Sequence, residues 1–391
     1  MRARIARWMA IPAAGAIALL TLPLAPGGST AIDARADADL PDALGMRVAA
    51  LDLQSAGAMT FGPDGTLFLA DSRAGRLHAV AVSDSGTNSF SAEQYIVPDI
   101  DRKIAAALGT TRDQIRFRDM AVHPRTRNVY FTVARAGDAG ADAAAALVRV
   151  RGRDAVEVLD LAQVRHSSAA VPAAPSRDAK TPWGQPQWML SVTDLAFVDG
   201  QLWVAGLSNE QFASALRRVP FPFAAPALTT VEIYHTSHDR YETAAPIDAF
   251  LPLTLNGEPM ILAGYGCSPI ATFRRADLIK GGHVRGRTVA ELGGGNRPVD
   301  MISYMRDGQP RILIANSDRT LMRIDPADIV AAPEMTTPVS QAYEPAGVKY
   351  LPVASAGVMQ LDDFDGDRVL VLRRDLETGY VHLTALQKKW L

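Results

Sequence analysis

The sequence has a single cysteine, Cys267, among its 391 residues. An intrachain disulfide is therefore excluded, and the fold must be stabilised by packing or by a bound ion. An excess of charge of either sign is also lacking, because 40 lysines and arginines stand against 42 aspartates and glutamates. Since no long basic run concentrates positive charge for phosphate binding, we expect no nucleic-acid partner.

A second apolar run of membrane length is absent as well. At the start of the chain, three arginines (Arg2, Arg4 and Arg7) precede an apolar run, Trp8–Leu24, that is followed by small residues. This pattern predicts a secretory signal over residues 1–31, cleaved near 31 or 36, and then a flexible leader over 32–45. We expect a periplasmic or secreted protein without stable membrane insertion after cleavage. The alternative is an uncleaved anchor.

What the sequence does have is a repeated phrase, first seen at Ala58–Val80. Gly62-Pro63-Asp64-Gly65 supplies the residues that a chain reversal needs, so Met59–Phe61 and Leu67–Ala70 are predicted to be two paired strands. Leu67–Ala70 is too apolar for a strand with one wet face, and we expect it to be buried on both sides.

Related phrases recur five more times, with a similar turn at a similar place. Six such units predict an all-β fold, a six-bladed β-propeller with four-stranded antiparallel blades, over residues 46–391. Gln94–Val97 is predicted to be the outer strand of the first blade. A lone strand within Met46–Leu53 is predicted to close the ring as the outer strand of the last blade. We expect a monomer.

Acidic residues stand just before the first inner strand of four consecutive repeats: Asp119, Asp194, Asp248 and Asp300. Because inner strands surround the axis of a propeller, these side chains should converge at the channel mouth. Converging carboxylates repel unless a cation neutralises them, and Ca²⁺ accepts many oxygen ligands. The four aspartates therefore predict a site for calcium or another divalent metal. The alternative is that each caps its own strand or pairs with Arg118 or Arg297.

The phrase FGPDGTLFLADSRAGRLHAV resembles a blade of the NHL and gluconolactonase-type six-bladed propellers. Relatives of that kind include calcium-dependent lactonases and esterases, strictosidine-synthase-like enzymes and propellers that only bind. The resemblance implies metal ligands at the positions of Asp194 and Asp248. It also implies a glutamate ligand in the first blade, where this chain has Ala58.

A second candidate group is His235 and His238 with Glu242, in the phrase YHTSHDRYET. Histidines near a carboxylate suit a transition metal or general-base catalysis, although solvated loop residues would look the same. Cys267, in a glycine-containing turn, suits a metal ligand, a nucleophile or a small buried side chain. Arg297 suits an anchor for a substrate carboxylate.

Three functions follow from these candidates. The first is a metal-dependent hydrolase of lactones or esters, with a small-molecule substrate, the aspartates as ligands or base, and His235 or His238 as acid or base. The second is a non-catalytic exported propeller that binds a small molecule, a glycan or a protein. The third is a redox role with copper on Cys267 and a histidine.

Overall fold

The computed structural model describes residues 42–84, 90–136, 142–279 and 281–391. The predicted signal segment 1–31 and most of the predicted leader 32–45 lie outside the described residues. None of the helices in the described ranges combines the length and the apolarity needed to cross a membrane.

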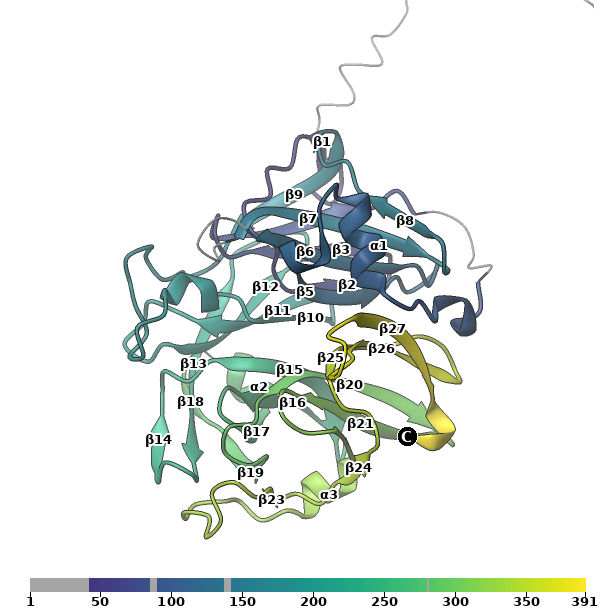
Figure 1. The fold of residues 1–391 in the computed structure, drawn as a ribbon. Helices are drawn as coiled ribbons and strands as arrows, with labels where there is room; N and C mark the ends of the chain where they lie inside the picture. Colours follow the sequence, from purple (N-terminus) through teal and green to yellow (C-terminus); the bar gives the residue numbers. More distant parts are fainter. Residues whose placement is uncertain (1–41, 85–89, 137–141, 280) are drawn as a thin grey trace, which may run out of the picture. The chain divides into compact units, whose positions relative to one another are not determined.

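The described chain is a six-bladed β-propeller, as predicted, with three to six strands in each sheet (Figure 1). The first blade has the order β1 (Arg47–Ala49), β9 (Val164–Ala170), β4 (Arg76–Ala81), β3 (Thr66–Asp71) and β2 (Met59–Phe61). The second has β5 (Ile115–Val122), β6 (Val129–Ala136), β7 (Asp142–Arg151) and β8 (Ala155–Val158). The third has β10 (Asp194–Val198), β11 (Gln201–Leu207), β12 (Ser214–Pro220), β13 (Ala227–His235) and β14 (Arg240–Glu242), with β18 (Gly282–Arg285) parallel to β13.

The fourth blade has β15 (Ile247–Leu255), β16 (Glu258–Tyr265), β17 (Pro269–Arg274), β19 (Arg287–Glu291) and β23 (Ala346–Gly347). The fifth has β20 (Pro298–Arg306), β21 (Gln309–Asn316), β22 (Leu321–Ile324) and β24 (Leu351–Val353), and the sixth has β25 (Val358–Asp363), β26 (Arg368–Arg374) and β27 (Val381–Gln387). The helices are short: α1 (Ile100–Ala107), α2 (Arg275–Ile279), α3 (Pro326–Ala331), and the 3-10 turns η1 (Ala92–Tyr95), η2 (Arg112–Gln114), η4 (Gln187–Leu190) and η5 (Lys388–Trp390).

The predicted turns form the inner hairpins of three blades. Both central residues of each two-residue turn have positive φ, which matches the twist of the flanking strands and favours Asn-Gly and Asp-Gly. These turns are Asp199-Gly200, Asn256-Gly257 and Asp307-Gly308.

Burial explains why the second strand of each blade is so apolar. All six residues of β3 are buried, which confirms the prediction for Leu67–Ala70. Six buried apolar clusters each lie between two blades, so every blade packs an apolar face against both neighbours. Burial of each leucine or valine side chain in these clusters stabilises the folded state by about 1.5–3 kcal/mol.

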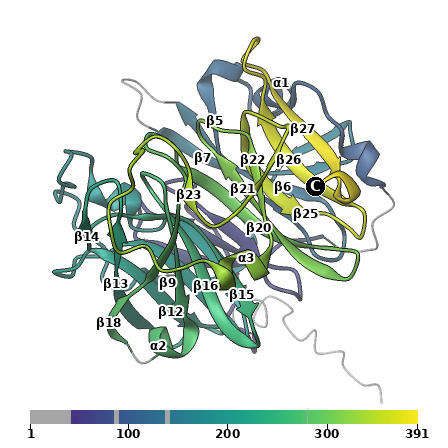
Figure 2. The same cartoon turned by 90° about the horizontal axis from the view of Figure 1, so that it is seen from below.

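The order of the blades around the ring differs from their order in the sequence. One cluster joins the first blade to the third, with the rings of Phe68 and Phe197 stacked at 4.7 Å. Another joins the second blade to the sixth, and there Tyr95 and Phe364 lie 5.2 Å apart. The second blade therefore lies between the sixth and the first, and both views show β25–β27, in yellow, beside α1, in blue (Figures 1 and 2).

Two strand predictions are wrong. The N-terminal strand does not close the last blade, because Arg47–Ala49 pairs with β9 at the edge of the first blade. Gln94–Val97 is not the outer strand of the first blade: its first two residues belong to η1, and β9 pairs with β4 instead. The physical reason is that Val97 exchanges two backbone hydrogen bonds with Leu383 at 2.8 and 3.0 Å, so the segment after the first blade already covers the edge of β27.

Candidate functional site

Three side chains from two neighbouring blades, His235, His238 and Cys267, form what we call the His–Cys cluster. His235 is the last residue of β13, and it lies opposite Arg240 in the hairpin that β13 forms with β14. His238 lies in the connecting turn, where its backbone N–H donates to the carbonyl of His235 at 3.1 Å. This tight turn places the two imidazole rings 4.0 Å apart, centroid to centroid.

Cys267 comes from the turn between β16 and β17. Cys267 and Ser268 have φ values of 81° and 98°, where side chains other than glycine are strained. Such strain costs about 1–3 kcal/mol for each residue and is concentrated at functional sites. The ligand atoms of His235, His238 and Cys267 all lie within 4.8 Å of one another, and within the described residues no other group of three or more His, Cys, Asp or Glu meets that spacing.

One carboxylate orients both imidazoles. Glu242 Oε2 lies 2.9 Å from His235 Nδ1, and Glu242 Oε1 lies 2.7 Å from His238 Nδ1. Burial alone would raise the pKa of Glu242, but the hydrogen bonds with the two histidines lower that pKa to about 2. With both Nδ1 atoms engaged, each Nε2 is the nitrogen available to a ligand. His235 is fully buried, and its Nε2 has no hydrogen-bond partner among the described residues.

Glu291, the last residue of β19, lies on the other side of His235. Its Oε2 lies 3.9 Å from His235 Nε2 and accepts a hydrogen bond from Thr236 Oγ1 at 2.6 Å. Its Oε1 accepts a hydrogen bond from Ser268 Oγ. Burial raises the pKa of this fully buried carboxyl. The cluster is thus bordered by two glutamates, Glu242 and Glu291.

The thiol of Cys267 is not activated as a free nucleophile. Burial raises its pKa, and the charges of Glu242, Glu291 and Asp248 raise it further. A reactive cysteine needs the opposite environment, an electropositive one that lowers the pKa. A bound metal ion would supply that positive charge and would deprotonate the thiol outright. The surroundings of Cys267 therefore favour a metal ligand over a nucleophile.

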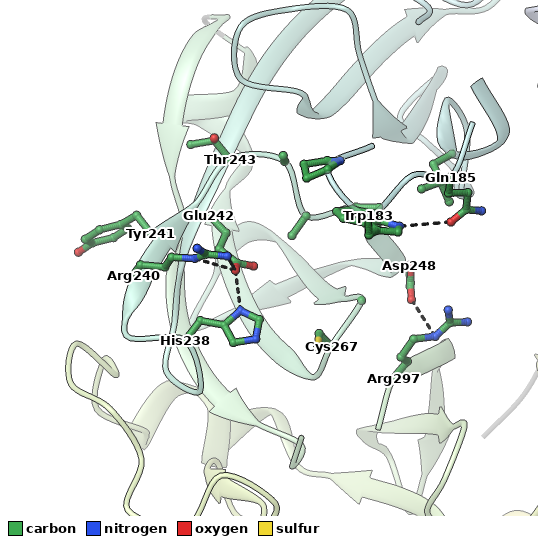
Figure 3. A pocket seen from close by; sticks show the side chains of 16 residues that line it. Trp183, Gln185, His238, Arg240, Tyr241, Glu242, Thr243, Asp248, Cys267 and Arg297 are labelled. Carbon is green, nitrogen blue, oxygen red and sulfur yellow. Dashed lines mark hydrogen bonds and ion pairs between the residues drawn. The ribbon is translucent and has the colours of Figure 1, made fainter. Parts of the chain in front are cut away.

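The His–Cys cluster opens into a cavity of about 550 Å³, which we call the outer cavity. His238, Glu242 and Cys267 line one wall, Trp183 and Gln185 come from the loop opposite, and Asp248 and Arg297 form an ion pair at 3.4 Å (Figure 3). Burial raises the pKa of Asp248 to about 6, against the lowering effect of Arg297. The volume is that of a small-molecule site.

The loop over this cavity, residues 172–191, is held by a buried arginine of β12. The Arg217 guanidinium donates to the carbonyls of Pro172 at 2.7 Å, Ser191 at 3.1 Å and Leu207 at 2.6 Å. These bonds fix both ends of the loop that carries Trp183 and Trp188. Arg217 is therefore a positioning residue for the cavity wall.

Asp119, Asp194 and Asp300, which we call the clasp aspartates, are held very differently. In each, Oδ1 accepts the backbone N–H of the next residue at 2.7 Å. In each, Oδ2 accepts a backbone N–H from the neighbouring blade, at 2.6 Å from Met59, 2.7 Å from Phe250 and 2.6 Å from Leu361. The three come from alternate blades of the ring, and each fastens its own blade to the next one.

The clasp aspartates also affect one another's charge. Burial raises the pKa of each well above its usual range. Charge repulsion raises it further, by Asp194 and Asp362 on Asp119, by Asp300 on Asp194, and by Asp119 and Asp362 on Asp300. The three carboxylates therefore lie close enough for their charges to act on one another, and their convergence at the channel mouth stays a prediction. Both oxygens of each accept a backbone N–H, which is the contact expected for strand capping, the alternative that the sequence left open.

Asp248 does not occupy the same position as the other three, so the predicted equivalence is wrong for this residue. A β-bulge precedes Asp119 and Asp300, at Arg118 and Val299. In β15 the bulge residue is Asp248 itself. Asp248 therefore stands one residue earlier in its strand than Asp119 and Asp300 do in theirs. Its side chain faces the outer cavity, where it pairs with Arg297.

Sequence reasoning missed Glu291 and Asp362. Asp362 Oδ2 accepts the N–H of Val122 at 2.6 Å and closes the junction between the sixth and second blades. Only the ring order reveals that junction, and the ring order does not follow the sequence. Glu291 ends a strand that aligns with no repeat phrase, so no sequence signal places it beside His235.

No family model and no curated protein matches the chain. Among solved structures it is similar to the dihydro-heme d1 dehydrogenase NirN in complex with DHE, with 16% identity, a TM-score of 0.35, and coverage of 85% of this chain and 54% of that one. It is similar to a chain of the mitotic checkpoint complex, with 13% identity, a TM-score of 0.36, and coverage of 95% and 99%. It is also similar to apo AztD from Citrobacter koseri, with 11% identity, a TM-score of 0.32, and coverage of 85% and 75%.

Proposed function

We propose that this propeller is a metal-dependent hydrolase in which His235, His238 and Cys267 bind a zinc-type ion. The supporting observation is Glu242, which engages Nδ1 of both imidazoles and leaves Nε2 of each ring for a ligand, while a ring nitrogen of each histidine lies within 4.8 Å of Cys267 Sγ. A carboxylate on the second ring nitrogen is the usual outer partner of a metal-binding histidine. Two nitrogens and one thiolate suit zinc, which in catalytic sites has three protein ligands and one open position.

Calcium, predicted from the aspartates, has less support. Each clasp aspartate already has a backbone N–H on both of its oxygens, so fewer lone pairs are left for calcium, which needs six to eight oxygen ligands. Asp248, the fourth aspartate, faces Arg297. The softer donors of the His–Cys cluster are unsuited to calcium and suited to zinc.

The residues around the cluster supply the remaining parts of an ester- or lactone-hydrolysing site. Zinc at this position would polarise the substrate carbonyl and activate a water molecule. Asp248, half-titrated near pH 6, would accept a proton from that water as its oxygen bonds to the carbonyl carbon, and would return the proton to the departing alkoxide. Arg297 would hold the substrate, and Trp183 would contact it from the opposite wall.

Zinc titration of the purified protein tests the proposal. We expect one zinc ion per chain by isothermal titration calorimetry after chelation, and loss of that binding in His238→Ala and in Cys267→Ser. His283→Ala is the matched control, because His283 also lies beside a glutamate, Glu232, but outside the cluster. Zinc binding that survives both cluster variants would overturn the assignment.

A copper site is the second candidate, because two histidines and one cysteine are also the ligands of trigonal copper centres. The outer cavity beside Cys267 favours hydrolysis, since electron transfer needs no substrate cavity of about 550 Å³. Two results together would favour copper. The protein with Cu²⁺ would show an intense visible absorption that is lost in Cys267→Ser, and the zinc form would hydrolyse neither lactones nor aryl esters. If the zinc form binds lactones or aryl esters but hydrolyses neither, the protein is a binding propeller. Export, predicted from residues 1–31, remains part of the proposal.

A further inference from the structure

A second cavity, of about 640 Å³, lies over the mouth of the central channel. We call it the mouth cavity. Residues in or just before the inner strands of all six blades line it: Ala58, Arg118, Thr193, Asp248, Val299 and Gln360. A molecule bound here would thus contact every blade.

Three arginines, Arg73, Arg118 and Arg297, are among the described residues that line the mouth cavity, together with one aspartate, Asp248. Arg297 pairs with Asp248. Each guanidinium group carries five N–H donors, more than one partner occupies. Guanidinium groups match carboxylate and phosphate oxygens in geometry as well as in charge.

The fold places two of these arginines at the cavity. Arg118 is the bulge residue of β5, the position that in β15 turns Asp248 out to the same cavity. The guanidinium carbon of Arg73 lies 5.7 Å from the centre of the Trp188 ring, another lining residue. Trp188 belongs to the loop that Arg217 holds, so the cavity has a defined wall.

The mouth cavity and the outer cavity are continuous in their lining. Leu190, Asp248 and Arg297 belong to both. One end of a bound molecule could therefore lie at the His–Cys cluster while the other lies among the arginines. Both volumes fall within the range of about 300–1,000 Å³ usual for small-molecule sites.

We propose that the mouth cavity binds an oxyanion group of a small molecule, a carboxylate or a phosphate, through Arg73, Arg118 and Arg297. Resting on the proposed hydrolase function, this makes the substrate an anionic ester or lactone whose charged end lies over the channel. Anion binding itself needs no metal, so it is separable from the zinc assignment.

Calorimetric titration of the metal-free protein with succinate, and separately with inorganic phosphate, tests the inference. We expect at least one of these anions to bind, and we expect Arg73→Ala and Arg118→Ala each to weaken that binding tenfold or more. Arg118→Lys, which keeps the charge but loses the planar fork, should recover part of the affinity. Arg274→Ala is the control, because Arg274 is an exposed arginine paired with Asp277, outside both cavities.

The succinate and phosphate arms identify the ligand chemistry, and thermal unfolding of each variant shows whether it is folded. If neither anion binds, or if the folded Arg73 and Arg118 variants bind as tightly as the parent, the inference is overturned. Loss of zinc binding in cluster variants has no bearing on this result. Failure of the zinc assignment and failure of the anion site are therefore distinguishable.

Discussion

The clasp aspartates and the His–Cys cluster are both groups of titratable side chains, and they differ in whether their buried polar atoms have hydrogen-bond partners. Every oxygen of Asp119, Asp194 and Asp300 accepts a backbone hydrogen bond within the described chain. In the cluster, His235 Nε2 has no such partner. A satisfied group stabilises the fold, whereas an unsatisfied buried group needs an explanation, and a bound ion is one such explanation.

The largest expected effect is the loss of stability when a clasp aspartate is removed. Asp194→Ala leaves the N–H groups of Leu195 and Phe250 buried without their acceptor. At about 1–3 kcal/mol for each unsatisfied group, the free energy of unfolding should fall by about 2–6 kcal/mol in urea denaturation. Calcium should not raise the melting temperature of the parent protein. A calcium-dependent rise that disappears in the variant would make the aspartates metal ligands after all.

The second effect is a pH dependence of stability. Burial raises the pKa of Asp362 to about 7, above its unfolded value, despite two backbone hydrogen bonds that lower it. The folded state therefore holds this proton more tightly, and stability is lost as pH rises from about 4 to about 7. In Asp362→Asn the decline in the free energy of unfolding should be smaller by up to about 4 kcal/mol. The difference in this free energy between parent and variant should therefore change over the same pH range. A constant difference across this range would contradict the prediction.

The third effect concerns the orienting carboxylate. Glu242→Gln keeps the size of the side chain but not its charge on the two Nδ1 atoms. We expect zinc affinity to fall about 10- to 100-fold, as is typical when an outer partner of a metal ligand is lost. Glu232→Gln, on a glutamate that pairs with His283 and Arg285, is the control. Equal zinc affinity in both variants would separate Glu242 from the metal site.

The smallest effect is on the ion pair at the cavity. Arg297 is more than half exposed, so Arg297→Ala should cost less than about 1 kcal/mol of stability. The same change removes the charge that lowers the pKa of Asp248, so that pKa should rise above about 6. Carbon-detected NMR titration of the Asp248 carboxyl measures it. An unchanged or lower pKa would show that the pair does not form in solution.

Much of the fold follows from local signals in the sequence. The Asn-Gly and Asp-Gly turns and the apolar second strands such as Leu67–Ala70 determine hairpins whichever blades they join. The ring order could not be predicted, because it depends on which apolar faces pack together. Phe68 against Phe197 is a contact that no local pattern encodes. For the same reason, the pairing of Val97 with Leu383 was not foreseen.

The candidate site was predictable in its residue types but not in its geometry. His235, His238, Cys267 and Arg297 stand out in the sequence, and the structure brings them to one cavity or its wall. The aspartates stand out equally, but Asp248 is the bulge residue of its strand, whereas Asp119 and Asp300 each follow the bulge residue of theirs. Spacing along the chain does not reveal bulges, and a shift of one residue reverses the side to which a strand residue points.

X-ray absorption spectroscopy of the zinc-loaded protein tests the central claim most directly. A zinc ion held by His235, His238 and Cys267 should show one sulfur at about 2.3 Å and two imidazole nitrogens at about 2.0–2.1 Å. Cys267→Ser should abolish the sulfur shell. A first shell of oxygen atoms alone, unchanged in Cys267→Ser, would contradict the assignment and return the metal to the aspartates.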